Sequence, residues 1–406
     1  MATPREGSGT GSRDHRPRAV RDSRGRIERV RRDRRLQGAV VVVAVVAGLI
    51  AGSLGTSRDR SARALGGATT TTVARASAPA PSRSVLLAHV DVNHRVDLLA
   101  VAGVNTGGRI GSVVFVPTTT LVQVPSFDTQ ALVDVVRLGG SNLNASTLLV
   151  TTVANALGIR FKQVLLLNNA GLTALLAPAD RMRVNFRHSV QVDDSAGTLA
   201  FTPGRATITS ADATRLLIGP TSGGALEHLV AVQAVLQGWF TRLRDKAVAH
   251  DSLTVGPAVR SLVALAHTQV NFDTIPVDVL SSGSVTRYEL QEPQAAESIR
   301  ADFPDGLITD SKRPRVEVLN GTGAVALTQA VARRIVPAGG EITLTGNVPG
   351  FGVRHTTVVY YRSADLPAAE HLAAALGVGS VAKGNIPIDV VDLTVVVGSD
   401  FHLTRS

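Results

Sequence analysis

The sequence predicts an α/β protein in which a mixed-sheet layered domain is followed by a smaller β-α-β-β-α-β domain and preceded by one transmembrane helix. Three observations lead to this fold class. An uncharged apolar run lies near the N-terminus, β-branched runs alternate with helical periodicity from residue 84, and the last part of the chain repeats this alternation compactly. A length of 406 residues allows two or three domains, and a 44% hydrophobic composition is enough for a sizeable core.

The predicted transmembrane helix covers residues 38–57, within a stretch from 36 to 57 that has no charged residue. About 20 apolar residues at about 1.5 Å rise per residue cross the roughly 30 Å hydrocarbon layer. Arginines are concentrated just before this helix, so the positive-inside rule places the N-terminus in the cytoplasm. We therefore expect a single-pass protein of the cell membrane whose C-terminal domains are extracellular. A cleaved signal peptide is the alternative, but the region before the apolar run is long for one.

Two segments without apolar periodicity flank this helix. Residues 1–37, predicted to be a disordered cytoplasmic tail, hold twelve Arg and no Lys against five acids, which is +7 of the chain's net charge of +10. We interpret this tail as attracted to anionic lipid. No nucleic-acid partner is expected, because aromatic residues make up 3% of the chain and no folded reading element accompanies the tail. Residues 58–83 are rich in Ala, Thr, Ser, Gly and Pro and predict a flexible stalk.

The first folded domain is predicted over residues 84–304. Apolar runs rich in β-branched residues predict strands at 84–90, 97–104, 111–116, 164–167, 183–186 and 190–192. Helical periodicity predicts helices at 129–138, 144–157, 171–176, 211–217, 225–243, 258–267 and 295–302. Strands interleaved with helices indicate a mixed α/β layered domain.

The second folded domain is predicted over residues 313–401. Its pattern gives strands at 315–319, 341–345, 356–361 and 392–397, with helices at 324–335 and 366–376. The turn at 320–323 opens the first of these helices, where backbone amides are able to hold an anion. We favour the simpler interpretation, in which Asn320 caps the helix.

These segments resemble the LytR-CpsA-Psr envelope family of Gram-positive bacteria. The resemblance is specific in the second domain, where VEVLNG at 316–321, TTVVYY at 356–361 and VVVGSD at 395–400 follow the LytR C-terminal accessory domain over its length. In the first domain Arg95-Val96-Asp97 resembles the family's Arg-Ser-Asp signature. Pro117, Gly139-Gly140, Gln233 and the phrase TIPVD at 274–278 also stand where that pattern places them.

The resemblance implies a sheet with a long apolar cavity for a polyprenyl chain. It also implies transfer of a glycopolymer from a polyprenyl-pyrophosphate carrier to peptidoglycan. Pyrophosphate requires several arginines and a divalent cation to absorb its charge, and carboxylates hold that cation. Carried over by position, the resemblance makes Arg95, Asp97 and Gln233 a remnant phosphate site, with Asp91 and Asp97 as metal ligands. Mg²⁺ is expected only if that site is active. The expected partners are the membrane and a polyprenyl-linked lipid or cell-wall polymer.

The chain departs from the family's pattern at the basic residues. Thr118 and Thr119 stand where the resemblance places an arginine and an aspartate, and Ile218-Gly219-Pro220 replaces an Arg-x-Arg pair. Each charge-assisted hydrogen bond to phosphate contributes about 1.5–3 kcal/mol, and each lost clamp costs about 10²–10³-fold in rate. The resemblance therefore implies a pseudoenzyme, a non-catalytic binding or scaffolding relative of the glycopolymer–peptidoglycan ligases. The alternative is an active phosphotransferase whose phosphate clamp is rebuilt from other residues.

The predicted site residues also have simpler structural roles. Arg95 and Asp97 would share a strand face and form an ion pair, because residues i and i+2 point the same way. Gln233 lies on an apolar helix face, where an internally bonded amide is expected. Among ten histidines, only His94 and His228 are placed near the site, and no spacing suggests zinc.

Overall fold

The computed structural model describes residues 84–104, 109–140, 143–219, 224–245, 256–281, 283, 285–324, 326–385 and 390–402. The predicted tail, transmembrane helix and stalk lie outside these ranges. Within them, no helix is both long and apolar enough to cross a bilayer.

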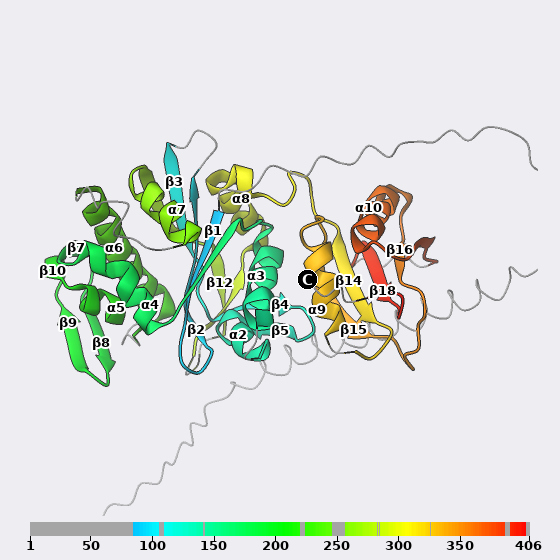
Figure 1. Cartoon of the computed structure of the whole chain (residues 1–406), viewed down its shortest axis with the longest axis horizontal. Helices are drawn as coiled ribbons and strands as arrows, with labels where there is room; N and C mark the ends of the chain where they lie inside the picture. The colour runs from blue at the N-terminus through cyan, green and yellow to red at the C-terminus, as the bar shows by residue number, and fades with distance from the viewer. Residues whose placement is uncertain are drawn as a thin grey trace, which may run out of the picture. The chain divides into compact units, whose positions relative to one another are not determined.

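A five-stranded mixed sheet forms the centre of the first domain (Figure 1). Its strand order is β11-β3-β2-β1-β6, in which β1 (Ser84–Val90), β2 (Val96–Val104) and β3 (Ile110–Phe115) form an antiparallel meander. On the two edges, β6 (Gln163–Leu167) runs parallel to β1 and β11 (Gln269–Thr274) runs parallel to β3. The three central strands have long apolar runs because both faces of the sheet are covered.

Each face of this sheet has its own core. Leu87 points to the face that packs against α4 (Asn169–Leu176), α5 (Ser210–Ile218), α6 (Ala225–Asp245) and α7 (Pro257–Ala266). Leu86 points to the opposite face, where α3 (Leu143–Leu157) and α8 (Glu292–Asp302) contribute side chains to the core. Figure 1 shows these helices on either side of the sheet. The mixed α/β layered class predicted from the sequence is thus confirmed for the described residues.

A second sheet, of order β12-β13-β4-β5, adds side chains to the core on the α3 side. It contains β4 (Thr120–Val124), β5 (Asp128–Ala131), β12 (Val277–Ser281) and β13 (Arg287–Leu290). The helix predicted at 129–138 is wrong in its first part, because residues 128–131 pair with β4 as an antiparallel strand. Only the residues that follow this strand are helical. They form a 3₁₀ turn (Leu132–Asp134) and then α2 (Val135–Leu138).

Two short ribbons lie beyond the helices α4–α6. One pairs β7 (Met182–Phe186) with β10 (Gly204–Ile208), and the other pairs β8 (Val190–Asp194) with β9 (Gly197–Phe201). The back of β7 packs on α6 at Gly238, where an added Cβ atom would lie 2.7 Å from the carbonyl oxygen of Arg183. A glycine is therefore required at this close approach of helix and strand.

The second domain is a mixed five-stranded sheet of order β15-β14-β18-β16-β17. Its elements are β14 (Arg315–Asn320), α9 (Leu327–Ile335), β15 (Glu341–Asn347), β16 (Thr357–Tyr360), α10 (Leu366–Leu376), β17 (Ser380–Lys383) and β18 (Leu393–Val397). The predicted β-α-β-β-α-β order missed one strand, β17, which lies between α10 and β18. This edge strand has four residues and no long apolar run. The predicted helix cap at Asn320 is wrong, because α9 begins only at Leu327 and its N-terminus has no side-chain cap. Oδ1 of Asn320 instead accepts from the backbone amides of Thr322 and Gly323 in the turn before the helix.

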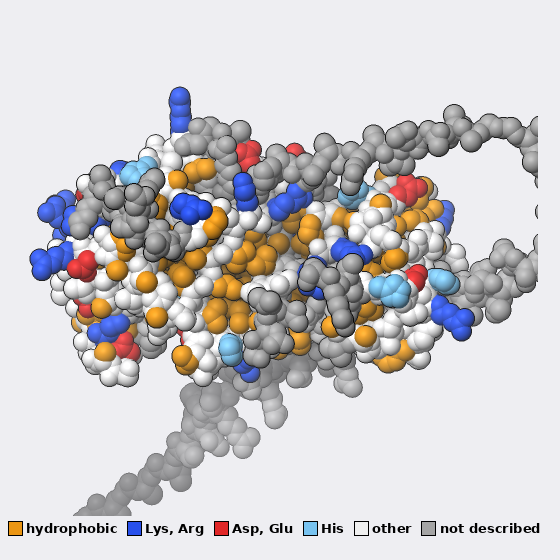
Figure 2. Space-filling model, in the orientation of Figure 1, with side chains coloured by type: hydrophobic (Ala, Val, Ile, Leu, Met, Phe, Trp, Pro, Cys, Tyr) orange, Lys and Arg blue, Asp and Glu red, His pale blue; other side chains and the backbone are white. Residues whose placement is uncertain are grey.

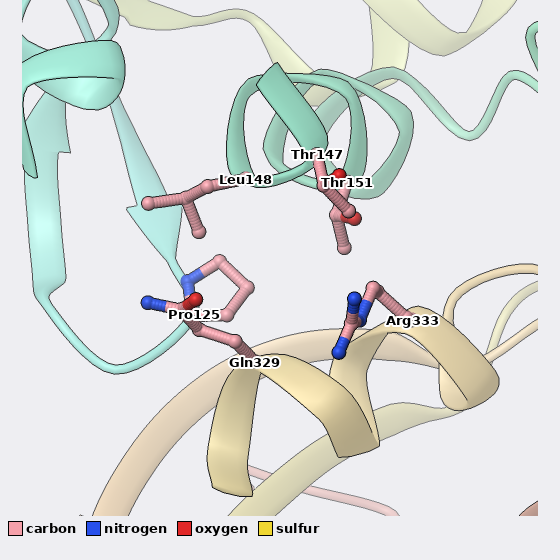
Figure 3. A pocket seen from close by; sticks show the side chains of 6 residues that line it. All are labelled: Pro125, Thr147, Leu148, Thr151, Gln329 and Arg333. Carbon is pink, nitrogen blue, oxygen red and sulfur yellow. The ribbon is translucent and has the colours of Figure 1, made fainter. Parts of the chain in front are cut away.

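The two domains contact each other through α3 and β15. The buried side chain of Asn155 donates to the carbonyl oxygen of Ile342 and accepts from its amide, both at 2.8 Å. Arg313 also reaches α3, donating to the Asn155 carbonyl oxygen at 2.7 Å. Figure 3 shows Arg333 of α9 facing Thr147 and Thr151 of α3, with Gln329 beside Pro125, around a gap of about 10 Å³. That volume holds about one water molecule, so the contact is close-packed.

Candidate functional site

The predicted phosphate site lies where β1 ends and β2 begins. Asp91 closes the turn between these strands, because its carboxylate accepts from the backbone amides of Asn93 at 2.8 Å and Arg95 at 2.7 Å. Partial burial raises the pKa of Asp91, but the hydrogen bonds from Arg95 and Asn93 outweigh this effect and lower it. Oδ1 of Asp91, a predicted metal ligand, thus accepts two hydrogen bonds within the turn. Arg95 itself is exposed to solvent.

Asp97 faces a histidine that the sequence analysis did not place at the site. The register of β1 and β2 shifts between His89 and Val90, so Asp97 is the extra residue of a β-bulge. Its Oδ2 lies 3.5 Å from Nδ1 of His89, whose side chain is 1% exposed. The Nε2 of His89 lies 2.9 Å from Oδ1 of Asn169, at the start of α4. The predicted ion pair of Arg95 with Asp97 is wrong, since among the described side chains the carboxylate of Asp97 lies beside His89 and makes no ion pair with Arg95.

The helix α6 contributes a second histidine, the half-buried His228, to this end of the sheet. Burial lowers the pKa of His228, although a hydrogen bond to the Leu217 carbonyl oxygen and the charge of Asp97 act in the opposite direction. Nδ1 of His228 and Nδ1 of His89 are both buried without a hydrogen-bond partner in the described part of the chain. Of the two predicted histidines, His228 is thus near Asp97, whereas His94 is exposed in the β1–β2 turn with a φ of 59°.

Gln233 has an internal partner, as its apolar helix face suggested. Its Nε2 donates to Oγ1 of Thr274 at 2.9 Å, which ties α6 to the end of β11. The structure therefore joins Asp97, His89 and Asn169 by direct contacts, and His228 lies within reach of the charge of Asp97. Among the described residues, no hydrogen bond or ion pair links Gln233, Asp91 or Arg95 to the carboxylate of Asp97.

A cavity of about 310 Å³ lies at the other end of the same sheet face. Ala102, Val104, Leu262 and Leu265 supply apolar lining from β2 and α7, while Lys162 contributes a charged group. The volume is at the lower end of the range for small-molecule pockets, about 300–1,000 Å³. An apolar chain with a polar end matches this lining.

The second domain contains a buried carboxyl in the middle of its sheet. Glu317 is 5% exposed, and its Oε2 accepts from Oγ1 of Thr394 at 3.0 Å, which in turn lies 2.8 Å from the hydroxyl of Tyr361. Burial raises the pKa of Glu317, although the Thr394 hydrogen bond opposes the shift. Burial, with the nearby charge of Glu317 as a smaller contribution, also raises the pKa of Tyr361 to about 12.

Glu317→Gln is expected to change how stability depends on pH. A carboxyl whose pKa is higher in the folded chain costs stability as pH rises from its unfolded value through its folded one, and the full cost remains above both. The free energy of unfolding of the Gln variant minus that of the wild type should therefore be larger at about pH 8 than at about pH 4.5. Urea unfolding at both pH values checks this, and an equal difference at the two would contradict it.

The second domain matches the model of one protein family. Residues 313–401 match the family model of the LytR cell envelope-related transcriptional attenuator. The resemblance to the LytR-CpsA-Psr family that VEVLNG, TTVVYY and VVVGSD suggested is thus confirmed at the LytR C-terminal domain. No curated protein matches the chain.

Solved structures similar to the chain include proteins described as members of the LytR-CpsA-Psr family. TagV of B. subtilis is 13% identical with a TM-score of 0.45, covering 54% of this chain and 96% of that protein. A LytR-Csp2A-Psr enzyme from Actinomyces oris is 14% identical with a TM-score of 0.43, covering 57% and 92%. TagT with bound octaprenyl pyrophosphate lipid is 16% identical with a TM-score of 0.41, covering 55% and 91%.

The residues at the Asp97 end do not form an evident Mg²⁺ site. Mg²⁺ prefers several oxygen ligands in octahedral geometry, whereas the side chain beside the Asp97 carboxylate is the imidazole of His89. Within the described ranges, no group of three or more His, Cys, Asp or Glu side chains is placed to hold a metal ion. Asp91 and Asp97 thus remain a sequence prediction as metal ligands.

Proposed function

We propose that the chain is a membrane-anchored protein of the cell envelope that binds a polyprenyl-linked lipid or cell-wall polymer without transferring it. In this proposal residues 38–57 form the anchor and the folded domains lie outside the cell. The match of residues 313–401 to a LytR family supports an envelope role. The cavity of about 310 Å³ under α7 supports an apolar ligand.

The contacts of Asp97 carry the non-catalytic part of the proposal. A transferase must neutralise a pyrophosphate leaving group, and arginine is suited to this because its guanidinium binds phosphate through two parallel hydrogen bonds. In the described part of the chain Asp97 instead faces His89, and no arginine pairs with it. Thr118 and Thr119 occupy the positions where the resemblance expects a basic and an acidic residue.

Native mass spectrometry of the detergent-extracted full chain tests the binding. We expect a co-purified polyprenyl lipid that is lost in Ala264→Trp, because Ala264 lines the cavity and the larger ring closes it. Ala374→Trp is the matched control, since Ala374 is exposed on a helix of the second domain. Mass spectra free of lipid for the wild type, or equal loss in both variants, would refute lipid binding in this cavity.

Transfer assays with a lipid-linked glycan separate the proposal from the phosphotransferase alternative. The proposal expects no phosphate release above background, in wild type or in Asp97→Ala. Release that depends on divalent cation and disappears in Asp97→Ala would establish the enzyme and reject the non-catalytic role.

A further inference from the structure

The ribbon of β7 and β10 presents a basic face to solvent. Residues alternate between buried and exposed along β7, so Arg183 and Asn185 point outward, and Arg187 follows in the same alternation. On the partner strand Arg205 lies directly opposite Asn185 and is also exposed. Figure 2 shows Lys and Arg side chains gathered at the end of the molecule where Figure 1 draws this ribbon.

The opposite face of the ribbon is fixed in the core of the first domain. Met182, Val184, Phe186 and Ile208 are each at most 2% exposed and pack in the core beside α6. The close approach of Gly238 to β7 leaves no space for the strand to shift toward the helix. Arg183 and Arg205 therefore project from a fixed ribbon, and Arg187 follows directly after the end of β7; we call these three arginines the arginine face.

No acid neutralises the arginine face within the described residues. None of its three guanidinium groups makes an ion pair there. The carboxylates of the neighbouring segments bond elsewhere: Asp180 to Ser210, Asp193 to Thr198, Asp194 to Arg215 and Asp212 to Thr209. Three unpaired guanidinium groups on one face create a positive potential there, which points to an anionic partner.

The spacing of the arginine face suits a linear polyanion. Arg183 lies on β7, and Arg187 follows directly after the end of that strand. Arg205 lies on β10 opposite Asn185, which stands midway between the other two in the sequence, and paired strands are roughly 5 Å apart. Guanidinium groups bind phosphate and carboxylate through paired hydrogen bonds. We propose that the arginine face is a docking surface for a linear polyanion that carries a phosphate or carboxylate group on each repeat.

Two other partners fit less well. A membrane-binding surface needs apolar side chains that enter the bilayer, and none of the large exposed hydrophobic residues in the described ranges lies on β7 or β10. Single-stranded nucleic acid needs exposed aromatic rings for stacking, but Phe186 of the ribbon is buried and stacks on Phe201. The surface is also separate from the proposed lipid site, since none of these arginines lines the cavity or contacts Asp97.

The test measures binding of linear inorganic polyphosphate to the full chain with a fluorophore at Ser189→Cys. Ser189 is exposed two residues after Arg187, and the chain has no other cysteine, so the label reports on the ribbon and not on the basic tail. We expect Arg183→Gln/Arg187→Gln/Arg205→Gln to weaken binding at least tenfold at low salt. The slope of log affinity against log salt should fall by about 0.7 for each contact removed.

The matched control removes the same charge elsewhere. Arg287, Arg300 and Arg354 are exposed and lie outside the ribbon, so their triple Gln variant should bind within about twofold of the wild type at the same salt. Equal weakening in both triple variants would overturn the proposal, because net charge alone would then explain binding. Repeating the measurement with poly-glutamate in place of polyphosphate identifies whether phosphate or carboxylate is preferred. Binding to anionic vesicles but to neither polymer would overturn the proposal in favour of a lipid surface.

Discussion

Asn155→Ala is expected to lower the free energy of unfolding by about 3 kcal/mol. The side chain of Asn155 is 3% exposed and bonds both the amide and the carbonyl group of Ile342 on β15. It also accepts from Arg313 at 3.3 Å. Alanine would leave these buried groups without partners, and each such group costs about 1–3 kcal/mol. Urea unfolding followed by circular dichroism measures the loss.

A second readout shows whether the two domains unfold together. The single tryptophan, Trp239, reports on the first domain, whereas circular dichroism reports on both. Coincident transitions in the wild type and separated ones in Asn155→Ala are expected, because the asparagine bridges α3 and β15. Asn271→Ala is the control, since Asn271 is exposed and its loss should stay within about 0.5 kcal/mol. A loss below about 1 kcal/mol at Asn155 would mean that this contact does not couple the domains.

The central strands were predictable because burial on both faces leaves a strong signal in the sequence. Strand β1 has apolar side chains for two cores, so its run of Val, Leu and Ala predicts a covered strand. Strands β9, β10 and β17 carry no such signal, since each is short and mostly exposed or half-buried. Their positions depend on pairing with neighbours that the sequence does not specify.

The candidate site shows the same limit at the level of single residues. Asp97 was found through its resemblance to a family signature, but its partner was not. Alternation predicts that Asp97 shares a face with Arg95. The bulge beside His89 turns the carboxylate toward that imidazole instead, and the strand begins only at Val96. A single extra residue in a strand is not visible in the hydrophobic pattern, so the His89 contact required the structure.

Trp239→Ala is expected to cost about 4 kcal/mol of unfolding free energy. Trp239 lies on α6, is 2% exposed and belongs to the core that this helix shares with the central sheet. Its ring meets that of Phe240 edge to face, with ring centroids 5.0 Å apart. Removing the indole leaves a cavity that the surrounding strands and helices fill only partly. Its Nε1 is buried without a described partner, so Trp239→Phe gives up no hydrogen bond and should cost only about 1 kcal/mol.

The contrast between these two variants bears on the proposed lipid binding. If the core around Trp239 is close-packed, Trp239→Ala should show the full loss of unfolding free energy and Trp239→Phe only a small one. Urea unfolding followed by circular dichroism measures both. A loss below about 2 kcal/mol for Trp239→Ala would show loose packing beside the sheet. The space for an apolar chain would then extend from the cavity under α7 toward Asp97. The full loss would confine that space to the described cavity, which admits only a short part of a polyprenyl chain.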